Sequence, residues 1–310
     1  MALKWNRKVL LAKIEAAYGT DAAPSGGANA VLATSVQLQP MEGQDVSREL
    51  ERVTLGPQPT VPVEVHAKLS FEVELAASGT AGTPPAWGPL LRACAVAETI
   101  AAGVSVTYNP VSIGHESATL HFWVEDTKYA IVGARGTATL KVEAQKVPKI
   151  AFVFTGLFVQ PGEAAQANPT LTAWQKPIVA TKTNTPVFTL NGQAFVLRSL
   201  ELDLANEVVT RFLIGSESVL ITQKAEKIAA TVEAVALTTF NPYALALAQT
   251  AVPMVLTHGV GAGKVVTLNA ALAQIQRPSG LAQAQGIVEW PLNLVPQVNA
   301  GNDQWTLVLS

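Results

Sequence analysis

Alternating apolar and polar residues dominate the chain and predict a mainly β protein. Four segments show the period of two that a half-buried strand requires: Val65–Leu75, Ala118–Val124, Thr137–Val142 and Lys149–Phe154. Turn signals such as Asn109-Pro110 and Val147-Pro148 separate these runs. Helical candidates are few, and the best are Ala86–Glu98 and Asn241–Thr250. The pattern therefore predicts a mainly β chain with one short helix in each half.

Proline-rich stretches indicate where the units divide. Pro161–Thr185 is rich in Pro, Ala, Thr and Asn, as a connection between two units would be. We therefore predict a first domain over residues 1–165, a linker over residues 166–185 and a second domain over residues 186–310. Another stretch, Gly56–Val63, contains three prolines, which argue against a central strand. It is expected to form an extended loop or an edge arm.

An internal repeat relates the two halves. At a shift of 159 residues the pattern R-[VF]-x-[LI]-G recurs, followed after eleven residues by K-[LI]-x-x-x-V-E, without a gap. The matched pairs are Arg52 and Arg211, Val53 and Phe212, Leu55 and Ile214, Gly56 and Gly215, Lys68 and Lys227, Leu69 and Ile228, Val73 and Val232, and Glu74 and Glu233. Matches in one register, followed by a helix candidate in both halves, indicate duplication.

The composition suggests that part of the protein surface is buried against other molecules. The 310 residues are 49% hydrophobic but only 14% charged, whereas a typical soluble domain carries about 25% charged residues. Such a chain either buries surface against copies of itself or is simply an alanine-rich soluble protein. The net charge of −2 gives no basic footprint for nucleic acid. No apolar run reaches the roughly 20 residues of a membrane helix, so we expect no membrane insertion.

A search for catalytic or ligand-binding motifs predicts no enzyme, metal or cofactor. Gly259–Lys264 (GVGAGK) resembles a phosphate-binding loop, but His258 replaces its first glycine and Val265 its Ser or Thr. The histidines show no metal-ligand spacing, and Cys94 is the single cysteine. Arg48 and Arg52 alternate with nearby carboxylates, which favours ion pairs within the chain or between subunits.

Duplication has a geometric consequence. Two similar domains in one chain can occupy successive places around a ring, so three chains would make a ring of six pseudo-equivalent domains. The duplicated Arg52 and Arg211 would then repeat one contact at two places.

Several motifs resemble the tail tube proteins of Mu-like and related siphophages and prophages. They are Lys13-Ile14-Glu15, Tyr18-Gly19-Thr20-Asp21, Gln39-Pro40-Met41-Glu42-Gly43, Gly79–Cys94, Tyr108-Asn109-Pro110, Gly133–Gly136, Phe154-Thr155-Gly156, Asn168-Pro169-Thr170 and Arg211–Glu217. The resemblance covers most of the first half and less of the second. The usual family member has one tube domain and forms hexameric rings, whereas this chain carries two, which favours a trimer with pseudo-sixfold symmetry.

The resemblance implies two tandem β-sandwich or barrel domains, each flanked by a short helix, in rings stacked as a tail tube. It also implies a virion protein, assembled in the bacterial host cytoplasm, that contacts tape measure and terminator proteins. Double-stranded DNA would pass through a neutral or acidic channel without specific binding. The alternatives are a tail terminator or other ring-forming tail component, or a carbohydrate-binding β-sandwich module. The predicted subunit or ring interface residues are Arg48, Arg52, Leu55, Gly56, Pro57, Pro59, Pro62, Arg211, Ile214 and Gly215.

Overall fold

The computed structural model describes residues 3–310, so the first two residues of the first predicted domain lie outside the described part. The first half contains β1 (Lys8–Ile14), β2 (Thr34–Ser47), β3 (Thr60–Glu74), α1 (Gly88–Arg92), β4 (Val96–Ala101), β5 (Ser105–Pro110), β6 (Ala118–Val124), β7 (Thr127–Glu143), β8 (Lys149–Phe158) and β9 (Gly162–Glu163). The second half contains β10 (Val187–Leu190), β11 (Gln193–Ala194), β12 (Leu197–Asp203), β13 (Asn206–Leu213), β14 (Ser216–Lys224), β15 (Lys227–Glu233), α2 (Pro242–Leu247), β16 (Ala251–His258), β17 (Val266–Ile275), β18 (Ala282–Ala284), β19 (Ile287–Pro296) and β20 (Thr306–Leu309).

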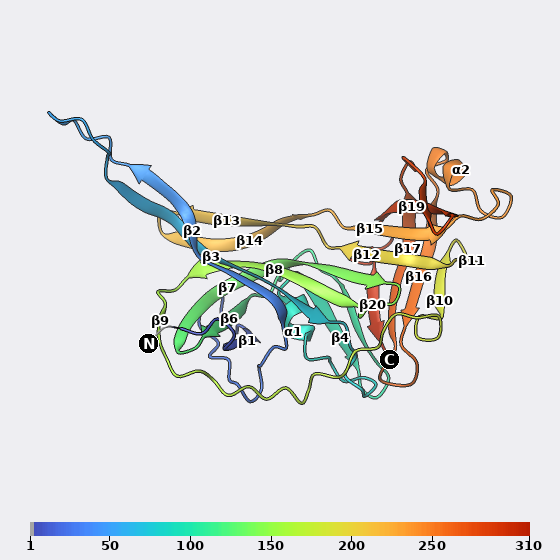
Figure 1. Cartoon of the computed structure of the whole chain (residues 1–310), viewed down its shortest axis with the longest axis horizontal. Coiled ribbons are helices and arrows are strands. Elements are labelled where there is room, and N and C mark those ends of the chain that lie inside the picture. Colours follow the sequence, from blue (N-terminus) through green and yellow to red (C-terminus); the bar gives the residue numbers. More distant parts are fainter. Residues whose placement is uncertain (1–2) are drawn as a thin grey trace.

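One antiparallel sheet runs through both halves of the chain (Figure 1). Its strand order is β2, β3, β8, β7, β12, β15, β19 and β18. The two halves meet where β7 pairs with β12. We call this the main sheet, because the arms and the second layer are built around it.

A second layer of strands covers one face of the main sheet. In the first half β1 pairs with β6, which continues into β7. Another series of strands is β4, β5, β20, β17, β16 and β10, so that the last strand of the chain lies against the first half. The core between the layers is a single hydrophobic cluster that includes Phe71, Phe152, Trp87, Trp290 and Trp305. Residues from both halves therefore share one core.

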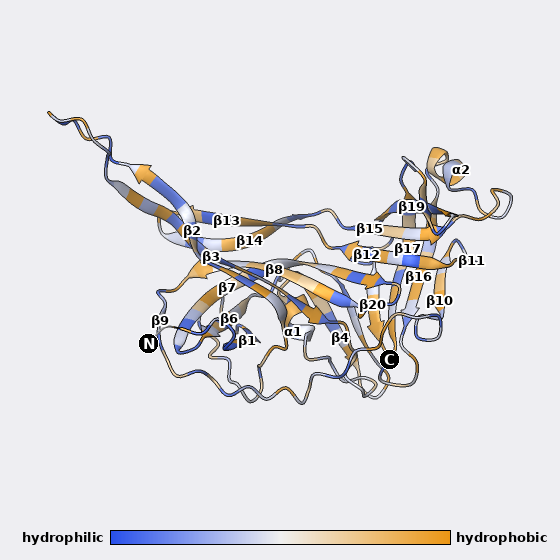
Figure 2. Cartoon of the chain, in the orientation of Figure 1, coloured by the Kyte–Doolittle hydropathy of each residue, from blue (hydrophilic) through white to orange (hydrophobic). Residues whose placement is uncertain are grey.

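The prediction of a mainly β fold is confirmed, and β3 shows why the pattern was informative. Leu69, Phe71 and Val73 are buried, whereas the alternate Lys68 and Ser70 are partly exposed. Alternating hydrophilic and hydrophobic bands are visible along the strands of the main sheet in Figure 2. One face therefore packs on the core and the other stays polar.

The prediction that Ala118–Val124 is half-buried was wrong, although the strand itself is β6 with the same bounds. All seven of its residues are buried. Its inner face packs on the main core, and Trp123 on the other face packs with Val9 and Leu11, covered by Ala167 and Leu171 of the connecting segment. A chain segment distant in sequence therefore buries the face that the pattern assigned to solvent.

Both predicted helices are present but shorter than predicted. Residues 96–98 of the first candidate belong to β4, because the chain turns at Ala95, which has a positive φ of 58°. In the second candidate, Asn241 caps the helix by accepting a hydrogen bond from the backbone N–H of Ala244 at 3.0 Å.

Two hairpin arms extend from corresponding places in the main sheet. The first arm, residues 40–67, lies beyond the pair formed by Gln39 and Lys68 and projects away from the body (Figure 1). The second arm, residues 204–226, lies beyond the pair formed by Asp203 and Lys227 and extends over the first half. The repeat thus places the two arms at equivalent positions, with different surroundings.

The predicted linker, residues 166–185, contains no helix or strand in the described structure. It runs along the first half, where Thr170 donates a backbone hydrogen bond to Gly26 at 2.8 Å and the Trp174 indole donates one to the Ala30 carbonyl at 2.9 Å. The boundaries at residues 165 and 185 stay a prediction, since the main sheet and the core connect the two halves.

Candidate assembly surfaces

The predicted interface residues lie at the tips of the two arms. The first tip, residues 48–59, joins β2 to β3 and contains Arg48, Arg52, Leu55, Gly56, Pro57 and Pro59. Pro62 follows within β3, where only β2 pairs with it. Arg211, Ile214 and Gly215 lie at the end of the second arm. The structure brings each set together within its own arm, while the second tip lies near the base of the first arm, where Phe212 contacts His66.

The first tip holds its shape through its own hydrogen bonds. The Gln58 side chain both donates to and accepts from the backbone of Leu50, at 3.0 and 3.2 Å, and Arg52 donates to the Pro57 carbonyl at 3.5 Å. Val53 and Leu55 are fully exposed. A loop that presents apolar side chains to solvent is typical of a surface that another molecule covers.

The second arm, by contrast, is anchored on the first half by polar bonds. Asn206 donates its side-chain N–H groups to the carbonyls of Cys94 and Gly136, at 2.8 and 3.0 Å. The Lys224 ammonium donates to the Ala95 carbonyl at 2.7 Å. These bonds satisfy carbonyls at the end of α1 and on β7, and they fix the direction of the arm.

The middle of the second arm is buried on a pair of side chains from the first half. The backbone N–H of Val219 donates to the Tyr18 hydroxyl at 2.6 Å, and its carbonyl accepts from Arg135 at 2.8 Å. The Arg135 guanidinium stacks 4.8 Å from the centre of the Tyr18 ring. Burial raises the pKa of Tyr18 and lowers the pKa of Arg135 and of Lys224. Partial desolvation at this contact therefore disfavours the charged forms of the three side chains.

The pairing of β7 with β12, which we call the seam, joins the two halves. Residues 139–143 pair in register with residues 199–203, antiparallel. Lys141 and Glu201 form an ion pair at 3.6 Å across the seam, and Thr139 donates to Asp203 at 3.4 Å. Backbone pairing and side chains both define this register.

The main sheet is open at both ends. Within the described residues β2 pairs only with β3, so its first residues present a free edge, and β18 pairs only with β19. An unprotected sheet edge recruits another strand. The chain thus presents a free edge from each half, at opposite ends of one sheet.

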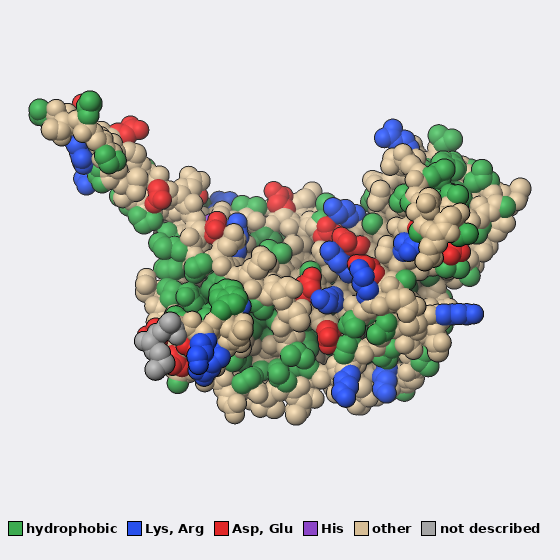
Figure 3. All heavy atoms as spheres, in the orientation of Figure 1, with side chains coloured by type: hydrophobic (Ala, Val, Ile, Leu, Met, Phe, Trp, Pro, Cys, Tyr) green, Lys and Arg blue, Asp and Glu red, His purple; other side chains and the backbone are tan. Residues whose placement is uncertain are grey.

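The second layer leaves one face of the main sheet uncovered. This face is polar, and its positive and negative side chains alternate. Ion pairs between neighbouring strands join Lys149 to Glu72 at 2.8 Å and Lys227 to Asp203 at 3.4 Å, in addition to the ion pair at the seam. Figure 3 shows positive and negative side chains side by side over β12 and β15, in a hollow between the arms and the α2 region. No single sign of charge dominates there.

Comparison with known protein families identifies the family of this chain. A family model described as phage tail tube protein matches residues 5–294, nearly the whole chain. The chain belongs to the phage tail tube protein family. None of the curated proteins compared with it matches. The chain is therefore a structural protein of the phage tail.

The tail tube match leaves the individual residues of the predicted interface untested. Arg48, Arg52 and Arg211 make no ion pair within the described chain, so the intramolecular half of that expectation is not realised. Sequence reasoning missed the seam and the free edges at residues 34–39 and 282–284. The repeat signalled equivalent strands, but strand order is not visible in a repeat.

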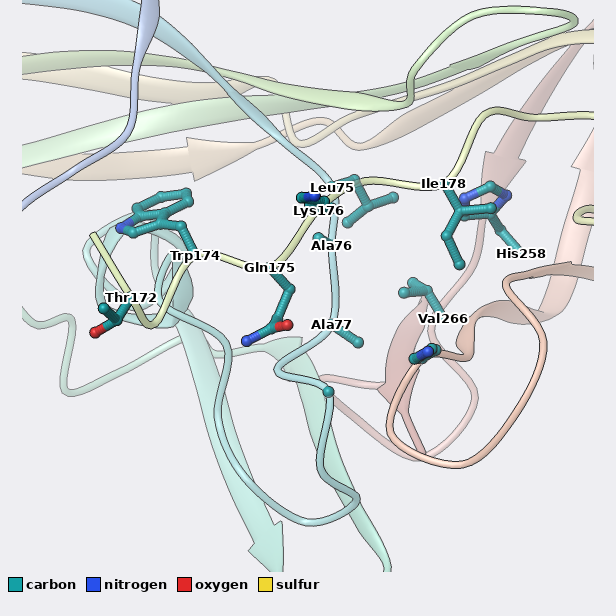
Figure 4. A pocket seen from close by; sticks show the side chains of 12 residues that line it. Leu75, Ala76, Ala77, Thr172, Trp174, Gln175, Lys176, Ile178, His258 and Val266 are labelled. Atoms are coloured by element: carbon teal, nitrogen blue, oxygen red, sulfur yellow. The ribbon is translucent and has the colours of Figure 1, made fainter.

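One cavity lies beside the connecting segment of this tail tube protein. A cavity of about 380 Å³ lies between the linker and the second half and is lined by Trp174, Gln175, Lys176, His258 and Lys264 among others (Figure 4). His258 is buried, and its Nδ1 is 2.9 Å from the Thr185 hydroxyl. Burial lowers the pKa of His258. Among the residues that the structure describes, this lining contains no carboxylate beside His258.

The described residues contain no group of three or more His, Cys, Asp or Glu side chains arranged to hold a metal ion. Searching the same residues for a helix long and apolar enough to cross a membrane finds none. Cys94 is buried, and desolvation raises the pKa of its thiol strongly.

Proposed function

We propose that this chain assembles as a ring of three copies with six pseudo-equivalent domains, and that the rings stack into the tail tube through which DNA leaves the virion. The observation that carries this proposal is the open main sheet. One chain joins a first-half strand to a second-half strand at the seam, and leaves one free edge of each kind. Copies that pair these edges would close a barrel and remove every edge of the sheet.

The arms support the same assembly. The second arm already lies on the first half of the same chain, whereas the first arm contacts the body at its base, near His66, and then projects away from it. The first tip extends the first arm further, by residues 48–59 in place of the two-residue turn at Ile214-Gly215. We propose that this tip reaches the adjacent ring, where Val53 and Leu55 would be buried.

The polar face of the main sheet is suited to line the channel. Phosphate contacts by free lysines would hold DNA by counterion release. Lys141, Lys149 and Lys227 each lie beside a carboxylate, so their positive charge is offset where the duplex passes. This arrangement supports the expectation of a neutral or acidic lumen.

Membership of a structural family supports the remaining parts of the proposal. The chain acts without catalysis, cofactor or metal, as two tandem tube domains over residues 1–165 and 186–310. Its partners are its own copies, tape measure and terminator proteins, and double-stranded DNA that passes without specific binding. It is assembled in the host cytoplasm and functions in the virion.

Negative-stain electron microscopy of the purified chain, over a concentration series, tests the proposal. Hollow tubes with a regular axial repeat and a threefold or pseudo-sixfold end view are expected. Single closed rings that never stack would instead support a terminator. Monomers that bind glycans would support the carbohydrate-binding module.

A further inference from the structure

The seam within one chain provides a template for the contact between chains, because the strands on its two sides have equivalents elsewhere. Leu69 lies between Leu38 and Phe154 in the first half. Its repeat partner Ile228 lies in the same way between Leu202 and Leu294. The first residues of β2 are therefore the equivalents of β12.

The register of this equivalence can be followed residue by residue. Ser70 pairs with Gln37, and Ala229, its counterpart at the 159-residue shift, pairs with Glu201. Gln37 thus occupies the position of Glu201. Within the described residues, Gln37 of the first half has no strand partner at its outer edge, whereas Glu201 of the second half pairs with Lys141 across the seam.

The other side of the seam has an equivalent too. In the first half Glu74 pairs with Lys149, which pairs with Lys141. In the second half Glu233 pairs with Glu289, which pairs with Ala282. Because Glu74 and Glu233 are repeat partners, Ala282 occupies the position of Lys141. The free edge of β18 is the equivalent of the edge of β7 that receives β12.

The arms repeat this relation. Val219 and Ile221 of the second arm are buried on the first half. The 159-residue shift relates them to Thr60 and Pro62 of the first arm, which are exposed. Lys224 of the second arm contacts the first half at Ala95, which follows α1 and has a φ of 58°. Gln249, which follows α2 in the second half, has a similar φ of 53°.

We propose that residues 34–37 of one copy pair, antiparallel, with residues 282–284 of a second copy, with Gln37 opposite Ala282. The first arm then lies over the second half of that copy, on the α2 side, as the second arm lies over the first half within one chain. Leu237, before α2, and Leu247, at its end, are exposed. This contact rests on the proposed ring and specifies which strands close it.

The contact between chains also differs from the seam in one respect. Gln37 and Ala282 replace Glu201 and Lys141, so the ion pair of the seam has no counterpart. The contact between copies would then depend less on salt than the seam does, because surface ion pairs are screened.

Cysteine cross-linking of the full chain tests this register. The variant Gln37→Cys/Ala282→Cys is oxidised after assembly and separated without reductant. We expect covalent dimers and trimers, and no larger ladder, because a ring of three closes. Lys141→Cys/Glu201→Cys is the matched control, which should cross-link within single chains. The native Cys94 is buried and remains in all variants.

A second control moves one residue to the opposite face of β18. Gln37→Cys/Gln283→Cys should give many-fold less covalent trimer. If tubes form but Gln37→Cys/Ala282→Cys does not cross-link above this control, the register is wrong while the tube function stands. If the Lys141→Cys/Glu201→Cys control cross-links but neither tubes nor intermolecular products form, both the register and the ring proposal fail.

Discussion

At the residue scale, a few polar side chains decide how the two halves fit together. Asn206 is buried and contacts two backbone carbonyls from different parts of the first half. Arg135 contacts Tyr18 and the carbonyl of Val219. These side chains reach across more than fifty positions in sequence. Their role follows from the fold, because no local pattern identifies them.

Asn206→Ala should destabilise the chain by about 1–3 kcal/mol, because it leaves the carbonyls of Cys94 and Gly136 buried without a donor. Urea denaturation measures the change. Gln223→Ala, on the exposed face of the same arm, is the control and should stay within about 0.5 kcal/mol. Equal effects of the two substitutions would contradict the anchoring role of Asn206.

Stability should fall as pH drops below the ordinary histidine range, in part through His258. Burial lowers its pKa in the folded chain, so the unfolded chain binds the proton first, near pH 6.5. The stability that neutral His258 contributes is therefore fully present above that pH and is lost progressively below it. Denaturation of the wild type and of His258→Gln between pH 7.5 and about 5 should show a shallower fall in the variant. Parallel curves would exclude a contribution from His258.

At the element scale, the two arms extend from equivalent strands but have different surroundings. Both are hairpins that extend from equivalent strand pairs of the main sheet. The second arm packs on the first half of the chain, while the first arm contacts the body only near its base and then projects away from it. The same element is thus a part of the folding unit in one half and a part of the proposed assembly surface in the other.

Substitutions at equivalent arm positions should therefore have opposite consequences. Val219→Asp places a charge in a buried site and should lower the free energy of unfolding by several kcal/mol. Thr60→Asp is exposed in the lone chain and should leave its stability within about 0.5 kcal/mol. It should nevertheless block ring formation. Thermal denaturation measures stability, and electron microscopy measures ring formation. Normal rings from Thr60→Asp would refute the proposed contact of the first arm with the second half of a neighbouring copy.

Shortening the first tip should separate ring formation from stacking. Replacing residues 48–59 by a two-residue Asn-Gly turn, of the kind that suits a hairpin, removes Val53 and Leu55 but keeps β2 and β3 paired. Single rings without tubes are the expected product in micrographs. Tubes of normal length would show that the tip does not connect rings.

At the scale of the whole molecule, the chain is an open sheet with a polar, charge-balanced face. Lys149 lies beside Glu72 and Lys141 beside Glu201, on neighbouring strands of that face. Such pairs contribute little to stability when exposed. Their value in the proposed tube lies in offsetting the positive charge that DNA would otherwise meet.

Glu72→Gln/Glu201→Gln should convert the proposed channel into a DNA-retaining one, because it leaves Lys149 and Lys141 without their carboxylates. Assembled tubes of this variant should retain double-stranded DNA, and the retention should weaken as salt rises. A filter-binding assay over a salt series measures it.

The control variant is Glu49→Gln/Glu51→Gln, which makes the same change of charge at the first tip, away from the polar face. It should not retain DNA above the wild type. Equal retention by both variants would attribute the effect to net charge and would overturn the assignment of the polar face to the channel.

The sequence by itself determined the mainly β class, the positions of both helices and the equivalence of Lys68–Glu74 with Lys227–Glu233. These are local properties, since alternation, capping residues and a repeat can be recognised without knowing what lies opposite. The family resemblance was likewise recognisable in motifs, and the family match over residues 5–294 bears it out.

Only the tertiary structure decided which strands are neighbours. The seam joins Thr139–Glu143 to Ser199–Asp203. Each strand offers an edge that its neighbours in its own half leave open, and the chain between them is long enough to bring the two edges together. The full burial of Ala118–Val124 likewise depends on a segment more than forty residues away. Strand pairing satisfies backbone groups that every residue carries, so the side-chain pattern specifies that a strand forms but not which strand it joins.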